Sequence, residues 1–359
     1  MTTHRQLIEA HTAAAAYYRA NLMSPRGTGP RDYLTRRSLD QALDDPRWTI
    51  GYAPPGWTQL LPHLRDRGFT DAEIHTAGLT VETRTGSLVD RFRDRLMLGI
   101  RDTNGDLVGF VGRCPPRARV DTPKYLNSPR TTLFSKGQHL FGLAEQYERL
   151  RAGGVPVLTE GPLDVLAIAN VSDKYAAVSA CGTALSPAQA QILREHSSND
   201  TVVVAYDGDT AGDRAGRTAY EHLALLFRRV LSTPMPKGHD PASLAETDPA
   251  SLSRCLRSAG PLADELVDNV LRYYEPKLDN AEARICALHE STRLIARLHP
   301  NDVARQIGRV SEGLRLSTTE VTKDLLENAG RRQTSVTRAR ASSLQGQIRR
   351  GNATSRLSR

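Results

Sequence analysis

The chain has 359 residues, 39% hydrophobic and 5% aromatic, with a formal net charge of +8. No apolar run approaches the roughly 20 residues that a transmembrane helix needs, and the N-terminus lacks a signal-peptide core, so we expect a cytoplasmic protein without membrane contact. The four cysteines are scattered without a C-x-x-C pair, which disfavours a disulfide framework and a structural zinc site.

The N-terminal region has the composition of helices separated by turn-rich segments. Residues 9–23 are alanine-rich with apolar side chains on one side, and SPRGTGP at 24–30 interrupts this pattern. A second helix is expected over 31–37. The segment WTIGYAPPGW at 48–57 reads as a turn-rich link, and 57–79 reads as a helix pair.

A β-hairpin and a basic segment are expected next. Asn-Gly at 104–105 separates two apolar, partly alternating runs, which is a strong hairpin signal. The following stretch, 113–136, contains six Lys or Arg residues and one acidic residue. We therefore expect a local basic surface here.

From Val155 onward, short apolar runs alternate with segments of helical length. The runs at 155–159, 176–180 and 201–206 are rich in valine and alanine. This alternation predicts a parallel sheet with helices on its faces, and ligands gather beyond the carboxyl ends of such strands. After Pro261 the chain contains four amphipathic helical segments.

Carboxylates follow two of the predicted strands. Glu160 comes directly after the first strand, with Asp164 about one helical turn later, and Asp207 and Asp209 come after the run at 201–206. Acidic groups at the same edge of a sheet repel one another unless a cation lies between them, and oxygen-only ligands favour Mg²⁺ or Mn²⁺. Gly212 would let a phosphate approach closely.

Each acidic motif has a structural alternative. Asp-Gly-Asp is common in turns, where aspartate caps a helix or forms an Asx turn. The joint occurrence of both motifs at strand ends in one α/β unit favours the functional interpretation.

The two acidic motifs, EGPLD at 160–164 and DGDTAG at 207–212, resemble the Toprim domain, a metal-binding α/β module shared by primases, topoisomerases and certain nucleases. The preceding region resembles the N-terminal part of the catalytic core of DnaG-type bacterial primases. This second resemblance rests on GYAPPGW at 51–57, RFRDRLMLGIRDTNGDLVGFVGR at 91–113 and PKYLNSPRTTLFSKGQHLFGL at 123–143. The similarity covers roughly residues 4–327.

The resemblance implies template-directed synthesis of RNA primers with Mg²⁺ (or Mn²⁺) and nucleoside triphosphates. It assigns Glu160, Asp207 and Asp209 to the catalytic metal site, with Asp164 in support, and Asp240 to the third family motif and the same metal site. It also implies a strip that holds single-stranded DNA template, nucleotide and the nascent RNA–DNA hybrid. This strip comprises Arg93, Arg95, Arg113, Lys124, Tyr125, Asn127, Ser128 and Lys136.

The expected architecture is α/β with helical additions. A basic α+β subdomain spans 1–150, a Toprim-type parallel-sheet domain spans 151–260, and a small helical bundle spans 261–329. The last segment, 330–359, contains eight arginines and no acidic residue, so it holds the whole positive surplus. Its few large apolar residues predict a disordered tail that contacts polyanions, although a tail that only increases solubility is the alternative.

The sequence departs from the family pattern in three respects. No Cys-His-Cys-Cys set is present, so we expect no zinc in this chain. Lys237 and Ala242 occupy places where the third motif usually carries acids. A helicase-binding domain is not evident.

These departures suit a compact, nucleoid-associated bacterial primase of a mobile element, whose partners would be a replicative helicase or a separate zinc-domain protein. Two other functions stay open. One is a Toprim nuclease, and the other is a non-catalytic single-stranded DNA-binding factor of replication or recombination.

Overall fold

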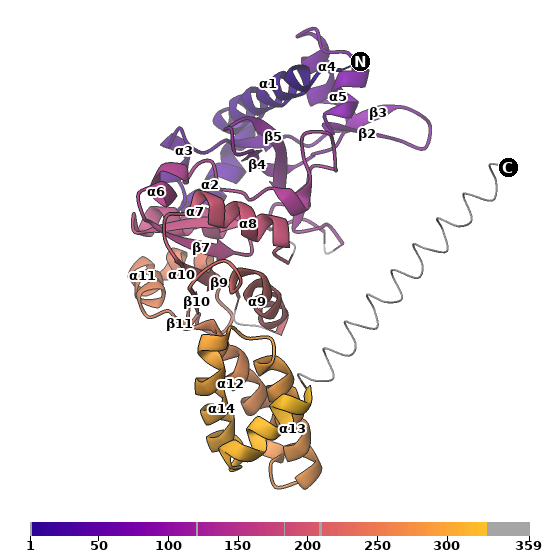
Figure 1. The fold of residues 1–359 in the computed structure, drawn as a ribbon. Helices are drawn as coiled ribbons and strands as arrows, with labels where there is room; N and C mark the ends of the chain where they lie inside the picture. Colours follow the sequence, from indigo (N-terminus) through magenta and orange to yellow (C-terminus); the bar gives the residue numbers. More distant parts are fainter. Residues whose placement is uncertain (1, 120, 183, 208–209, 329–359) are drawn as a thin grey trace, which may run out of the picture. The chain divides into compact units, whose positions relative to one another are not determined.

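The computed structural model describes residues 2–119, 121–182, 184–207 and 210–328 (Figure 1). The chain forms two compact units, Met1–Leu262 and the part that begins at Ala263. The predicted tail and Asp209 lie outside the described residues. Within the described part of the chain, no helix combines the length and the apolar character needed to cross a bilayer.

The first half of the first unit combines the long helix α1 and several shorter helices with a four-stranded antiparallel sheet. The sheet has the order β1-β4-β5-β6, and a separate two-stranded sheet pairs β2 with β3. The helices are α1 (His4–Met23), α2 (Thr28–Arg36), α3 (Gln41–Asp44), α4 (Leu60–Arg65), α5 (Asp71–Thr76) and α6 (Tyr147–Arg151). The strands are β1 (Ile50–Ala53), β2 (Thr80–Glu82), β3 (Leu88–Asp90), β4 (Arg95–Arg101), β5 (Leu107–Arg113) and β6 (Tyr125–Asn127).

The predicted hairpin is confirmed. β4 and β5 pair in antiparallel register from Leu96 opposite Arg113 to Arg101 opposite Leu107. Gly105 in the connecting turn has φ +87°, a left-handed conformation that glycine adopts without steric cost.

The prediction of a turn-rich link over 48–57 was wrong for its centre. Ile50–Ala53 forms β1, which pairs with β4 and is buried at all four positions. Helix α1 packs against it so closely that a Cβ on Gly51 would lie 2.5 Å from Cβ of Tyr18. In a strand that is buried on both faces, polar and apolar residues do not alternate, so the sequence lacked the pattern that would predict a strand.

The second predicted helix also begins earlier than expected, at Thr28. The proline at position 30 lies in the first turn of α2. Proline is tolerated there because the first amide groups of a helix have no intrahelical partner.

The second half of the first unit is a five-stranded sheet with the order β11-β10-β9-β7-β8. Its strands are β7 (Val155–Thr159), β8 (Tyr175–Ser179), β9 (Thr201–Ala205), β10 (Arg229–Ser232) and β11 (Gly260–Pro261). The helices are α7 (Pro162–Val171), α8 (Pro187–His196), α9 (Thr210–Leu223), α10 (Pro241–Thr247) and α11 (Pro249–Arg257). Strands β7 to β10 are parallel and β11 is antiparallel, so the predicted α/β sheet is confirmed.

The strand order creates a switch point between β7 and β9. The chain leaves β7 for β8 on one side and then returns to β9 on the other side of β7. In open α/β sheets, ligands bind beyond the carboxyl ends of the strands at such a point. The fold therefore indicates a ligand-binding site beyond the carboxyl ends of β7 and β9.

A buried carboxylate near the first sheet predicts a pH-dependent stability. Glu145 is buried, with Arg101 Nε 3.7 Å from its Oε1. Burial raises the pKa of Glu145 to about 7, and Arg101 only partly opposes this. Because the folded protein binds this proton more tightly than the unfolded chain, its stability should fall as the pH rises from about 4.5 to 7.

Glu145→Gln should therefore remove this pH dependence. Relative to wild type, the free energy of unfolding of the variant should be up to roughly 3 kcal/mol higher at pH 8 than at pH 4. Urea unfolding of wild type and variant across this range measures it. Parallel profiles for the two proteins would contradict the assignment.

The described part of the second unit, up to residue 328, consists of helices, as predicted for the segments after Pro261. They are α12 (Leu262–Tyr274), α13 (Ala281–Ile295), α14 (Pro300–Leu314) and a helix over 318–328. Helices α12 and α14 are joined by ion pairs from Arg305 to Asp264 and from Arg309 to Asp268.

Candidate active site

Two predicted acidic residues meet at the switch point. Glu160 directly follows β7, and Asp207 follows β9 after one intervening residue. Oε1 of Glu160 accepts a hydrogen bond from the backbone N–H of Asp207 at 3.4 Å. The Ser179 hydroxyl donates to the backbone carbonyl of Glu160 at 2.9 Å, which fixes the loop after β7. Adjacent parallel strands thus deliver two carboxylates to one edge of the sheet.

These residues line a cavity of about 130 Å³. The expected supporting residue Asp164 and the third-motif residue Asp240 line it as well, and so do three members of the predicted strip, Arg113, Lys124 and Tyr125. Acidic groups from the parallel sheet and basic groups from the antiparallel sheet therefore share one small space.

Asp164 connects two helices at the base of this cavity. Its Oδ2 accepts the backbone N–H of Gly161 and its Oδ1 accepts that of Ala242, both at 3.1 Å. These amides lie at the N-termini of α7 and α10. Burial, followed by the nearby Asp240 carboxylate, raises the pKa of Asp164 to about 8. Each oxygen of Asp164 thus accepts one backbone amide, one from the start of each helix.

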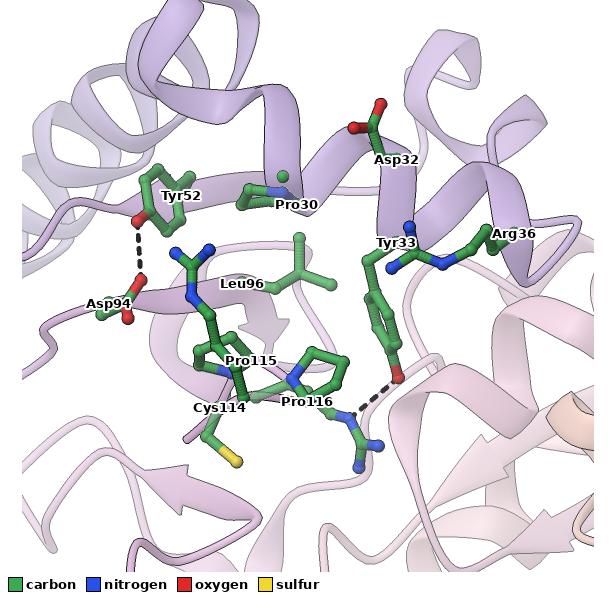
Figure 2. Close-up of a pocket in the computed structure, with 13 residues that line it drawn as sticks. Pro30, Asp32, Tyr33, Arg36, Tyr52, Asp94, Leu96, Cys114, Pro115 and Pro116 are labelled. Carbon is green, nitrogen blue, oxygen red and sulfur yellow. Dashed lines mark hydrogen bonds between the residues drawn. The ribbon is translucent and has the colours of Figure 1, made fainter. Parts of the chain in front are cut away.

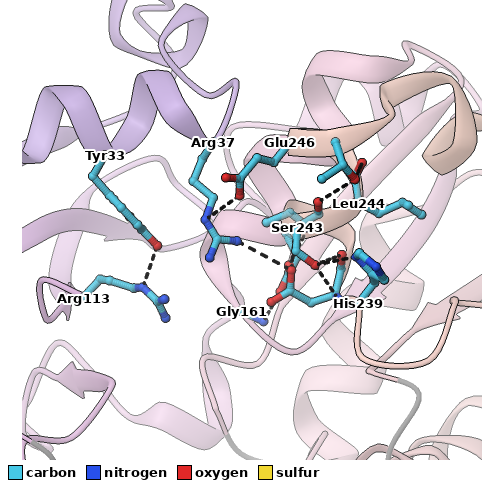
Figure 3. A network of polar contacts seen from close by, with 12 residues as sticks. Tyr33, Arg37, Arg113, Gly161, His239, Ser243, Leu244 and Glu246 are labelled. Atoms are coloured by element: carbon cyan, nitrogen blue, oxygen red, sulfur yellow. Dashed lines mark hydrogen bonds and ion pairs between the residues drawn. The ribbon is translucent and has the colours of Figure 1, made fainter. Parts of the chain in front are cut away.

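Asp240 is the N-cap of α10. Its Oδ1 accepts the backbone N–H of Ser243 at 2.6 Å, and the Ser243 hydroxyl accepts the backbone N–H of Asp240 at 2.9 Å. Arg37, at the end of α2, lies 3.9 Å from the same carboxylate and 3.2 Å from Glu246 (Figure 3). Arg37 also lines the cavity.

The sequence reasoning missed Arg37. Only its place beside Arg36 at the end of a predicted helix marked it, and about 200 residues separate it from Asp240. That contact depends on tertiary structure.

Arg113 faces the acids from the end of β5. Its Nε donates to the hydroxyl of Tyr33 at 3.1 Å, and its guanidinium lies 4.9 Å from the centre of the Tyr125 ring. Its Nη1 is buried and has no hydrogen-bond partner among the described residues. A buried guanidinium with an open donor is suited to a phosphate oxygen.

The remaining members of the predicted strip do not line this cavity. Arg95 is 6% exposed and donates to the backbone carbonyls of Gly112 and Pro123. Ser128 is also buried, and its hydroxyl accepts the backbone N–H of Phe110. Both therefore stabilise the antiparallel sheet in this structure.

The other three members lie elsewhere in the first unit. The Arg93 guanidinium lies 4.4 Å from the centre of the exposed Trp57 ring. Asn127 donates to the carbonyl of Cys181 at 3.2 Å, and Lys136 donates to that of Gly182 at 3.3 Å. The Asn127 contact connects the antiparallel sheet to the loop after β8, and Lys136 contacts the same loop from the segment 136–138.

The donor set suits a hard divalent cation. Within the residues that the structure describes, no three Asp, Glu, His or Cys side chains form a group that could hold a metal ion, and Asp209 is outside them. Glu160 and Asp207 supply only oxygen, the ligand type that Mg²⁺ and Mn²⁺ prefer. At the third motif, Ala242 lines the cavity without a carboxylate and offers only its backbone amide to Asp164.

Gly212 leaves room beside these acids. A Cβ on it would lie 2.1 Å from the carbonyl oxygen of Asp207 and 3.4 Å from Oε1 of Glu160. Gly212→Ala should therefore displace Asp207 and reduce catalytic turnover at this site about a hundredfold. The matched control is Gly216→Ala in the same helix, whose Cβ would meet only Leu262 at 3.9 Å and which should retain activity. Equal turnover by the two variants would contradict the close approach.

Known protein families match both halves of the first unit. Residues 17–147 match the family described as the DNA primase catalytic core, N-terminal domain. Residues 157–245 match the Toprim-like family. The two matches together include every residue of the cavity.

Several curated relatives are DNA primases. The protein from Streptomyces coelicolor is 33% identical over 308 residues, which cover 84% of this chain and 47% of that protein. The protein from Pseudomonas aeruginosa is 36% identical over 284 residues, which cover 77% of this chain and 42% of that protein. The chain thus spans about half the length of the curated relatives that it matches.

Solved structures extend the likeness. The RNA polymerase domain of the Mycobacterium tuberculosis primase DnaG, in complex with double-stranded DNA, has a TM-score of 0.73 at 30% identity, covering 88% of this chain and 100% of that one. A DnaG primase catalytic domain bound to single-stranded DNA has a TM-score of 0.70 at 28% identity, covering 88% and 98%. The chain belongs to the family of DnaG-type DNA primases, and the part matched is their catalytic core.

Proposed function

We propose that this chain is a DNA primase that synthesises short RNA primers on single-stranded DNA by metal-dependent nucleotidyl transfer. The observation that carries the proposal is the cavity at the switch point, where Glu160 and Asp207 lie opposite Arg113 and Lys124. Nucleotidyl transfer needs this combination, because negative charge develops on the attacked phosphate and on the leaving pyrophosphate.

In this proposal Glu160, Asp207 and Asp209 hold Mg²⁺, which Mn²⁺ can replace, and Asp240 contributes from the third motif. The cation supplies neutralisation of phosphate charge and orientation of the reacting oxygens. Arg113 and Lys124 bind the phosphates from the opposite wall. The Tyr125 ring contacts the Arg113 guanidinium and restricts its movement. Arg93, Arg95, Asn127, Ser128 and Lys136 complete the strip for template and nascent hybrid.

Asp164 and Arg37 would act as positioning residues. Asp164 holds the first turns of α7 and α10 together through two backbone amides, so it fixes the loops that carry Glu160 and Asp240. Arg37 draws α2 toward α10 through Glu246. Neither side chain needs to touch the reacting atoms.

The proposed partners follow from this chemistry. They are single-stranded DNA, nucleoside triphosphates, the RNA–DNA hybrid, and a replicative helicase or a separate zinc-domain protein. The DnaG catalytic domain bound to single-stranded DNA supports the first of these. We place the protein in the bacterial cytoplasm, associated with the nucleoid, with no zinc in this chain and a role in replicating a mobile element.

We also propose a functional division of the chain. A nucleic-acid-binding subdomain would span 1–150, a metal-binding Toprim domain 151–260, a helical bundle 261–329 and a polyanion-binding tail 330–359. The switch-point cavity has walls from the first two segments, so neither segment alone would synthesise primers.

One observation favours a second candidate. Ala242 and Lys237 replace acids of the third motif, and a protein that had lost turnover would retain its basic strip. Such a protein would bind single-stranded DNA without synthesis. A Toprim nuclease would instead cleave the DNA.

Labelled nucleoside triphosphates on mixed-sequence single-stranded DNA, with Mg²⁺ or Mn²⁺, distinguish these functions. The proposal predicts short RNA products that require both template and metal. Tight DNA binding without products on varied templates would contradict it and favour the binding protein. Shortened template would favour the nuclease.

A further inference from the structure

A second and larger cavity lies beside the candidate active site. It has a volume of about 260 Å³ and is formed by α2, the end of β1, the start of β4, and the segment that follows β5 (Figure 2). None of the acids at the switch point lines it. The roles proposed above therefore leave this cavity without a function.

The walls of this cavity form an apolar slot. Pro30 of α2 lies on one side, Pro115 and Pro116 lie on the other, and Leu96 of β4 lies between them (Figure 2). The proline rings offer rigid apolar surfaces, and none of these proline or leucine side chains carries a hydrogen-bonding group. A planar ring is the ligand shape that such a slot accommodates best.

One end of the slot carries a fixed carboxylate. The Tyr52 hydroxyl donates to Oδ1 of Asp94 at 2.7 Å (Figure 2). Asp94 has φ +47°, a conformation that non-glycine residues rarely adopt and that often occurs at functional sites. Burial and this hydrogen bond raise the pKa of Tyr52, while the positive charge of Arg117 opposes the rise. Arg117 therefore acts on the same end of the slot.

The opposite end carries guanidinium groups. Arg36 of α2 lies there beside Tyr33, whose hydroxyl accepts the hydrogen bond from Arg113 (Figure 2). Arg113 lines this slot and also the cavity of the acids. The two cavities are thus neighbours on either side of one guanidinium.

We propose that the slot binds an unpaired nucleotide of the single strand that passes the candidate active site. The base lies between the prolines with its edge toward Asp94, and its flanking phosphates lie on Arg36, Arg113 and Arg117. This inference rests on the proposed function for the identity of the strand. The position of Arg113 favours a strand over a separate ligand, because one chain of phosphates can contact both cavities.

Gly29 allows the slot to be blocked without damage to the fold. It lines the slot, lies in helix α2, and a Cβ on it would have no heavy atom within 4 Å. Gly29→Trp should therefore fill the slot and weaken binding of a single-stranded oligonucleotide by about 5- to 100-fold, the usual cost of losing one stacked base. Gly308→Trp in α14 is the matched control, because Gly308 is also helical with open space around it.

Chemical protection identifies the occupant. Gly29→Cys should react with a maleimide, and oligo(dC) should slow this reaction at least tenfold, whereas the exposed Cys286 should react at an unchanged rate. Equal reaction of Gly29→Cys with and without the oligonucleotide would overturn the proposal. Equal protection by free cytidine monophosphate would also overturn it, because the slot would then be a nucleotide site.

The protection assay needs neither nucleoside triphosphate nor divalent cation. Protection of Gly29→Cys by oligo(dC), without RNA synthesis by the protein, would therefore contradict the proposed function and support nucleotide binding in the slot. A protein that makes RNA without protection would contradict the slot alone.

Discussion

Asp207→Asn and Glu160→Gln are each expected to reduce RNA synthesis about a thousandfold or more while single-stranded DNA binding is retained. Both substitutions preserve the size of the side chain and remove its charge. The Glu160 carboxylate also accepts the amide of Asp207, so the two groups form one unit and the double variant should lose little more than either single variant.

The matched control for this prediction lies at the other end of the same strand. Asp200 immediately precedes β9, and its carboxylate pairs with Arg194 at 2.8 Å on the protein surface. Asp200→Asn should synthesise RNA as the wild type does. The site assignment would be wrong if Asp207→Asn retained more than a tenth of wild-type synthesis, or if both variants lost it equally.

Asp164→Asn should lower both stability and synthesis, for a different reason. Each carboxylate oxygen of Asp164 accepts one backbone amide, whereas the amide side chain of asparagine has a single oxygen. One buried N–H would then face another donor, which costs about 1–3 kcal/mol of unfolding free energy. The starts of α7 and α10 would separate, and the residues that follow β7 would lose their support.

Urea unfolding and a synthesis assay measure the two effects of Asp164→Asn on the same preparation. Asp173→Asn serves as the control, because Asp173 is exposed and contacts Arg149 at the surface. A role for Asp164 in helix positioning predicts that lower temperature restores part of the lost synthesis. Full stability together with abolished synthesis would contradict that role and make Asp164 a catalytic residue.

The sequence predicted β7, β8 and β9 because each is a short valine- or alanine-rich run followed by a segment of helical length, whereas β10 and β11 lack that composition and were not predicted. It also predicted the meeting of Glu160 and Asp207, since carboxyl ends of parallel strands share one edge. The order β9-β7-β8 could not be read from these patterns. That order makes β7 and β9 neighbours and so brings the two acids together.

Other features of the fold and of the candidate site could not be predicted from the sequence for physical reasons. Strand β1 was missed because burial on both faces removed its alternation. The motif that assigns Arg95 and Ser128 to the phosphate-binding strip does not reveal that both are buried and contact backbone groups of the sheet. Arg37 enters the site only through tertiary contacts with α10. Burial and tertiary contacts both depend on the folded chain, so neither leaves a local signal in the sequence.

Mn²⁺ binding, measured by electron paramagnetic resonance as loss of the free-ion signal, tests whether the carboxylates at the switch point hold a cation. Wild type and Asp200→Asn should bind Mn²⁺ alike, and Mg²⁺ should compete for the site. Glu160→Gln and Asp207→Asn should each weaken that binding at least tenfold. Unchanged Mn²⁺ binding by both site variants would show that the carboxylates at the β7–β9 switch point do not hold the cation.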